Sequence, residues 1–172
     1  MEQDEKQALV ADPALIGRAA AEPQRAPVGA LAPAALAGLV AAIVAGVIWG
    51  LIVKTTNYEI GIAAWGVGLL AGWGVHLAAG RRIRPELAAI AVVAALLGIL
   101  LGKYLSFVFV ARDEGSKLGL DIPLFSSRTW NLFWDSKGDV FSFFDVVWIA
   151  LAVVTAARVA MASYGRRRTA TV

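Results

Sequence analysis

Four long, mostly apolar stretches constrain this sequence more than any other feature. They cover residues 34–53, 60–79, 86–110 and 140–162. A helix of about 20 residues spans roughly 30 Å, the thickness of the bilayer hydrocarbon, and each stretch reaches that length. Backbone polar groups in lipid must be hydrogen-bonded within the segment, which favours helices. The sequence therefore predicts an all-α fold, a polytopic transmembrane four-helix bundle.

The composition supports the same interpretation and excludes several functions. Of the 172 residues, 59% are hydrophobic and 17% are charged, against about 45–50% and about 25% in soluble domains. The chain has no Cys and one His, which excludes disulfides, thiolate catalysis, cysteine zinc sites and bis-histidine haem ligation within one chain. It also lacks the common phosphate-binding, hydrolase and zinc-protease motifs. We expect no enzymatic activity, no cofactor and no metal.

The segments between and around the four stretches define the expected organisation. Residues 1–33, with four prolines, are expected to form a flexible N-terminal tail. Residues 34–163 are expected to form the transmembrane domain, with residues 111–139 as its long external loop. The last residues, 164–172, are expected to form a short basic tail.

The distribution of arginines predicts the orientation. Six of them lie in the second short link and in the C-terminal tail: Arg81, Arg82, Arg84, Arg166, Arg167 and Arg168. Lys and Arg accumulate on the cytoplasmic side, so we expect a multi-pass protein of the inner cell membrane with both termini cytoplasmic. These arginines are candidate contacts for lipid headgroups, each worth about 1 kcal/mol. Basic and aromatic residues are not interleaved, so we expect no nucleic-acid partner.

Small residues recur at helical spacing within the first three stretches. The candidate packing residues are Gly38, Ala42, Gly46, Gly50, Gly61, Gly68, Gly72, Ala94, Gly98 and Gly102. Such rows allow two helix backbones to approach closely. They predict packing within the chain or, as the alternative, an interface with a second copy or a membrane partner.

Two charged residues inside the apolar stretches are candidates for an ion pair. Lys103 lies 17 residues past Glu86, roughly 26 Å along a helix, and Asp145 begins the fourth stretch. Both are therefore expected near the outer boundary. An ion pair between them is one hypothesis. The alternatives are snorkelling of the lysine to water and, less favoured, a path for ions or protons.

The long loop combines aromatic residues with charges. Trp130, Phe133 and Trp134 lie among acidic and basic residues, a mixture typical of the headgroup zone. Ser126 or Ser127 is a candidate cap for a short amphipathic helix over about 127–135. The loop is interpreted as a surface loop with an interfacial helix or, alternatively, as a binding surface for a partner.

Two stretches resemble small four-span bacterial integral membrane proteins of uncharacterised function. They are YEIGIAAWGVGLLAGWGVHLAAG at 58–80, followed by a basic turn, and FFDVVWIALAVVTAARVA at 143–160. The resemblance implies architecture and no activity. Since polar residues lie near the ends of the stretches, we expect an accessory or scaffold protein. Its expected partners are the lipid bilayer and other membrane proteins or itself. An oligomeric transporter or channel subunit is the alternative.

Overall fold

A computed structural model describes residues 31–56, 58, 61–80 and 85–162 of the chain. Over these residues the fold is all-α. The helices are α3 (Leu31–Thr56), α4 (Ile62–Ala79), α5 (Pro85–Lys117), α6 (Ser127–Asp135), α7 (Lys137–Val140) and α8 (Phe143–Ala160). Four of them, α3, α4, α5 and α8, are long and apolar enough to cross a membrane. They correspond to the four predicted stretches.

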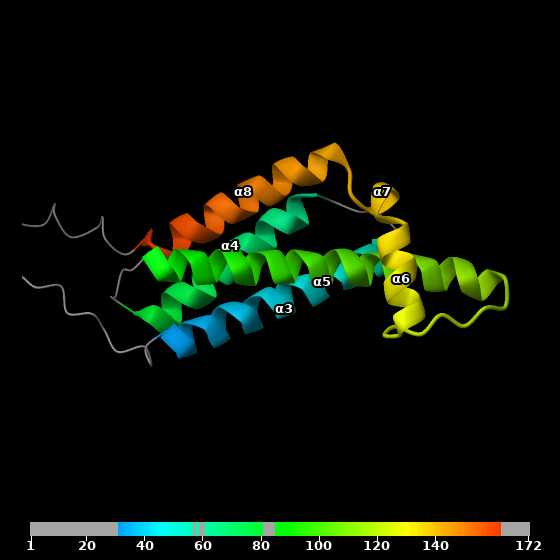
Figure 1. Ribbon diagram of the computed structural model, residues 1–172, viewed down its shortest axis with the longest axis horizontal. Helices are drawn as coiled ribbons and strands as arrows, with labels where there is room; N and C mark the ends of the chain where they lie inside the picture. The colour runs from blue at the N-terminus through cyan, green and yellow to red at the C-terminus, as the bar shows by residue number, and fades with distance from the viewer. Residues whose placement is uncertain (1–30, 57, 59–60, 81–84, 163–172) are drawn as a thin grey trace, which may run out of the picture.

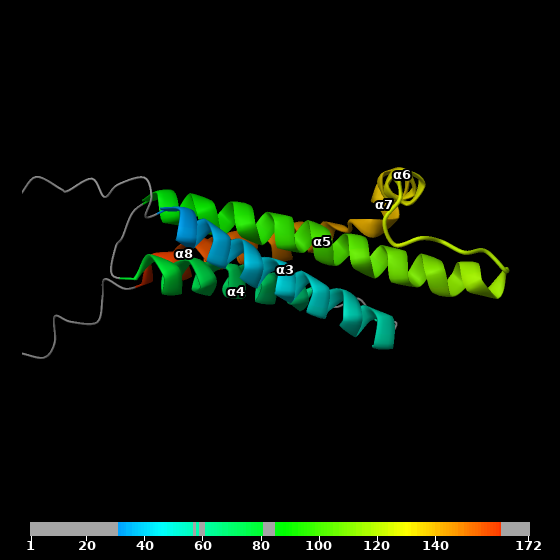
Figure 2. The ribbon, with the colours of Figure 1, turned by 90° about the horizontal axis from the view of Figure 1, so that it is seen from below.

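The four long helices run side by side along the long axis of the molecule (Figure 1). The two middle helices in sequence, α4 and α5, each pack against both α3 and α8. The start of α3 and the end of α8 lie at the same end of the bundle, which we call the terminal end. At the opposite end, which we call the cap end, α6 crosses α5 (Figures 1 and 2).

Close approach of backbones explains why small residues line the bundle interior. A Cβ atom added to Gly46 would lie 2.6 Å from the carbonyl oxygen of Gly98, and one added to Gly68 would lie 2.5 Å from that of Ala152. All eight glycines among the predicted packing residues would meet an atom within 3.0 Å, and Ala42 and Ala94 are buried. These residues pack within the chain, and α3, α4, α5 and α8 approach each other through them.

The prediction that a loop begins at residue 111 is wrong, because α5 continues to Lys117. Its 33 residues correspond to roughly 50 Å, well beyond the roughly 30 Å of bilayer hydrocarbon. The apolar run ends near 110, but hydrogen bonding along the helix does not. Lys117 Nζ lies 3.3 Å from Asp113 Oδ2 and 2.6 Å from Glu114 Oε1, one turn back on the same helix.

A glycine motif sets the actual end of α5. Gly119 has φ of 71°, its N–H donates to the Ser116 carbonyl at 3.1 Å, and the Leu120 N–H donates to the Gly115 carbonyl at 2.9 Å. This is the Schellman pattern, in which a left-handed glycine satisfies the last helical carbonyls. The chain then turns back and brings Ile122 against Gly115. A Cβ atom added to Gly115 would lie 2.9 Å from Ile122 Cδ1.

The fourth helix also differs from its predicted bounds. It was expected over 140–162, whereas α8 begins at Phe143 and ends at Ala160. Phe141, in extended conformation with φ of −113°, separates it from the single turn of α7. Ser142 caps α8, since the pair Ser142 and Asp145 forms a reciprocal capping box. The capping box therefore sets the start of this helix.

Candidate functional site

The candidate site is the cap end of the bundle, and we call residues 118–142 the cap. Its main element is α6, which begins where the sequence predicted. Ser126, one of the two predicted caps, accepts a hydrogen bond from the Thr129 N–H at 3.0 Å. The Thr129 hydroxyl donates to the Pro123 carbonyl at 2.9 Å. These bonds fasten the start of α6 to the loop before it.

An aromatic cluster holds the cap on α5. Phe133 of α6 is fully buried, and its ring centroid lies 5.5 Å from that of Tyr104 and 5.7 Å from that of Phe107, both edge-on. Such ring pairs contribute beyond the apolar area that they bury. The Tyr104 hydroxyl donates to the Leu124 carbonyl at 2.8 Å. The cap is therefore joined to α5 by apolar packing and by a hydrogen bond.

Beneath the cap, the structure brings together the two residues of the hypothetical ion pair. Lys103 Nζ lies 2.9 Å from Asp145 Oδ1, with side chains only 3% and 10% exposed. The ammonium also donates to the Val140 carbonyl at 2.8 Å. It lies 5.5 Å from the ring centroid of Phe141 and 6.0 Å from that of Trp49, within the range of cation–π attraction. Lys103 is thus buried and paired, and does not snorkel.

The carboxylate of Asp145 is equally engaged. Its Oδ2 accepts from the Ser142 N–H at 2.7 Å and from the Ser142 hydroxyl at 3.0 Å, while Oδ1 faces Lys103. Buried charges are retained when they are paired and hydrogen-bonded in this way. The cluster joins α5 to the start of α8 and to the end of α7. Its role is structural: a buried ion pair with hydrogen bonds, which we call the ionic latch, holds these helices together.

Sequence reasoning missed the neighbours of this pair and one other polar contact. The Ser-x-x-Asp spacing of 142–145 is a capping signal, and it could have predicted the contact between Ser142 and Asp145. The Trp65 indole N–H donates to the Thr155 hydroxyl at 3.0 Å, joining α4 to α8. No short-range pattern indicates that contact. The predicted headgroup arginines at 81, 82, 84 and 166–168 lie outside the described residues.

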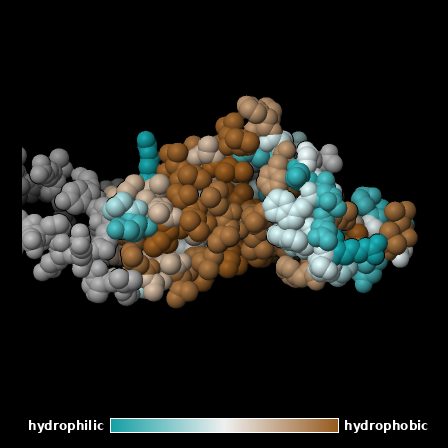
Figure 3. All heavy atoms as spheres, viewed as in Figure 1, coloured by the Kyte–Doolittle hydropathy of each residue, from teal (hydrophilic) through white to brown (hydrophobic). Residues whose placement is uncertain are grey.

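The cap carries a groove, here called the outward groove, with a mixed apolar and polar lining. It encloses about 760 Å³ between residues 120–123 and α6. Its wall includes three charged residues, Asp121, Arg128 and Asp135, together with the exposed Leu120 and Leu132. Hydrophilic residues gather on this end of the molecule, while the middle of the bundle is covered by hydrophobic ones (Figure 3). Non-obligate protein–protein interfaces have a comparable mixture of apolar and polar surface.

Comparisons of the chain with protein-family models, with curated proteins and with solved structures found no match. The resemblance of residues 58–80 and 143–160 to small four-span bacterial membrane proteins stays an expectation.

Proposed function

We propose that this chain is an integral membrane accessory protein, which binds another membrane protein through the outward groove of its cap. The groove carries the proposal, because it combines exposed leucines with charges on a well-anchored element. Surfaces that present apolar anchors within a polar rim suit specific association. Asp121 lies 4.0 Å from Arg112, so Asp135 at the end of α6 is the acidic group left for a partner, and a segment with a basic residue beside apolar ones fits the groove best.

The lengths of the helices support the proposed placement in the membrane. From Pro85, about 20 residues of α5 cover the roughly 30 Å of hydrocarbon, which places Lys103 and Tyr104 near the far boundary and the cap outside. The hydrophobic middle of the bundle would then face lipid (Figure 3). The arginines near the terminal end favour a cytoplasmic location for that end.

The bundle interior favours an accessory role over transport. Transporters keep ionisable or unwound sites near the bilayer midplane. Here the buried residues along the described part of the bundle are mainly Ala, Gly and Val, and the Lys103–Asp145 pair lies at the cap end. The two charged groups bind each other, and each also has a hydrogen bond to a backbone group.

Site-specific photocrosslinking in cells tests the proposal. Leu132, exposed in the groove, is replaced by a photoreactive amino acid, and the exposed Leu36 of α3 serves as the control position. We expect one discrete adduct from position 132 and none of that mass from position 36. The same partner should co-purify in stoichiometric amount in mild detergent, and D121K/D135K should abolish the adduct.

Solute flux or conductance by the pure protein in liposomes, without any partner adduct, would replace the proposal with an oligomeric transporter or channel subunit.

A further inference from the structure

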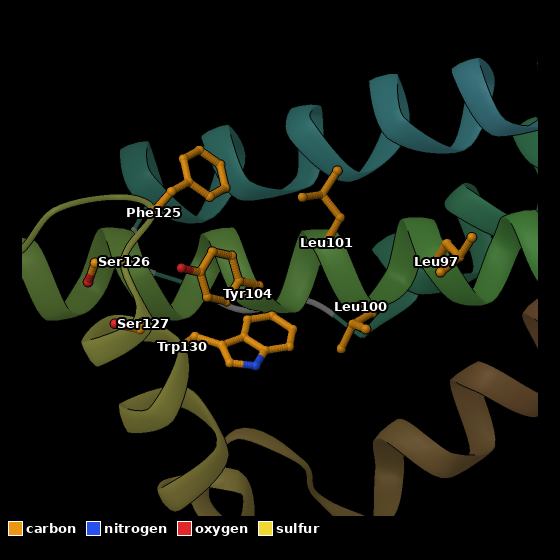
Figure 4. A pocket seen from close by; sticks show the side chains of 8 residues that line it. All are labelled: Leu97, Leu100, Leu101, Tyr104, Phe125, Ser126, Ser127 and Trp130. Carbon is orange, nitrogen blue, oxygen red and sulfur yellow. The ribbon is translucent and has the colours of Figure 1, made fainter.

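A second groove lies between α5 and the cap, on the side of the bundle. It encloses about 420 Å³, a volume within the usual range of small-molecule sites. Its floor is formed by Leu97, Leu100 and Leu101, which share one face of α5 (Figure 4). Phe125 and Trp130 of the cap gather over Tyr104 at the other end. None of the residues that line the groove is charged.

The aromatic end of this groove is preformed. The Tyr104 ring lies 6.0 Å from the ring of Phe125 and 5.4 Å from that of Trp130, centroid to centroid. The hydroxyl of Tyr104 is held by the Leu124 carbonyl at 2.8 Å. Tyr104 is buried and held in this way, so binding would need little ordering of this side chain, which lowers the cost of association.

The lining of the groove becomes more polar from Leu97 toward the cap. Leu97 to Leu101 lie roughly 18–24 Å along α5 from Pro85, and Tyr104 roughly 29 Å, close to the boundary of a roughly 30 Å hydrocarbon layer. Beyond Tyr104 the wall contains the hydroxyl groups of Ser126 and Ser127. An apolar trough, an aromatic collar and then hydroxyls match an acyl chain followed by its ester and headgroup.

We propose that this groove is a binding site for one membrane phospholipid, with an acyl chain along the leucines and its ester oxygens toward Ser127. The inference rests on the membrane placement given under the proposed function. Leu97, 49% exposed, lies at the open end, so the groove is continuous with the surface that would face lipid. The leucines are too large for close helix docking, which uses small residues, and this argues against a second copy as the occupant.

Photolabelling of the full chain in phosphatidylcholine vesicles tests this site. The probe is a trace of phosphatidylcholine with a diazirine in the middle of one acyl chain. Leu51, a similarly exposed leucine of α3, is the reference. We expect labelling of residues 97–104, beside the acyl chain, to exceed labelling around Leu51 about tenfold, the ratio that corresponds to about 1.4 kcal/mol.

Matched variants separate the site from general lipid contact. Leu101→Trp fills the trough and should reduce labelling to the level around Leu51, whereas Leu51→Trp should leave it unchanged. If Leu101→Trp does not fold, Leu97→Trp at the open end replaces it. Uniform labelling of all lipid-facing helices would overturn the lipid site, and so would crosslinks between two chains through this groove.

The two proposals fail in different ways. A folded chain without label on any helix would disprove membrane placement, and with it both proposals. Uniform labelling together with an intact partner adduct at position 132 would remove only the lipid site.

Discussion

At the scale of single residues, Gly66 and Gly68 of α4 have opposite surroundings although only one residue separates them. A Cβ at position 68 would lie 2.5 Å from the Ala152 carbonyl oxygen, whereas one at position 66 would meet nothing within 4 Å. Gly68→Ala should therefore destabilise the bundle by about 1–3 kcal/mol, the usual cost of overpacking. Gly66→Ala should be neutral or stabilising by up to about 1 kcal/mol.

Thermal unfolding in mild detergent, followed by size exclusion, measures both variants. Equal midpoints for the two would show that α4 and α8 do not approach each other through this face.

The buried ion pair gives a second prediction at this scale. Lys103→Met leaves the buried Asp145 without its counter-charge, so we expect a loss of about 3–5 kcal/mol in the free energy of unfolding. The double variant K103M/D145N removes both charges and keeps an acceptor for Ser142. It should recover most of that loss, as judged by the same thermal assay. A double variant no more stable than Lys103→Met would contradict a direct coupling of the two residues.

How far single residues could be predicted depends on the range of their interactions. The small-residue rows follow from spacing on one helix. Nine of the ten residues are buried, and the tenth, Gly61, is half-buried against Trp148. Gly74 was missed, although a Cβ there would lie 2.7 Å from the Ala37 carbonyl oxygen, because it lies off the row of Gly68 and Gly72. The contact of Lys103 with the Val140 carbonyl joins residues 37 apart, and no local pattern encodes it.

At the scale of elements, the existence of the helices was predictable and their ends were less so. Apolar runs locate the part of a helix that can lie in lipid. They do not locate its ends, which depend on capping. Gly119 and the Ser142–Asp145 box are the signals that set the end of α5 and the start of α8. Ser126, one of the two predicted caps, is the N-cap of α6. The orientation of α6 across α5 depends on Phe133 packing and was not predictable.

The cap gives a prediction for a whole element. Phe133→Ala removes the buried ring that α6 packs against Tyr104 and Phe107. A loss of about 3–5 kcal/mol is typical of such truncations, and it should fall on the cap alone. Hydrogen exchange should then speed up over residues 120–140, with α3 and α4 still protected. The exposed Phe143→Ala is the control and should change neither region. Equal loss of protection in α3 would mean that the cap and the bundle unfold together.

At the scale of the whole molecule, the two ends of the bundle are chemically different. The cap end carries an ionic latch, an aromatic cluster and the outward groove. The start of α3 and the end of α8 lie together at the terminal end. If α3, α4, α5 and α8 all cross a membrane, the even number of crossings puts both of these on one side. Residues 111–117 of α5, which extend beyond the apolar stretch, would then lie on the other side.

Cysteine labelling tests this arrangement, since the chain has no Cys of its own. In intact cells, a membrane-impermeant maleimide should label Ser116→Cys, near the end of α5. It should not label Ser163→Cys in the C-terminal segment, because the arginines at 166–168 favour the cytoplasmic side. Permeabilised cells provide the control, where both positions should react. Labelling at 163 with protection at 116 would invert the topology and place the cap in the cytoplasm. A chain that is folded and monodisperse in buffer without detergent would contradict membrane insertion itself, because the apolar surface of α3 and α8 would then have to be stable in water.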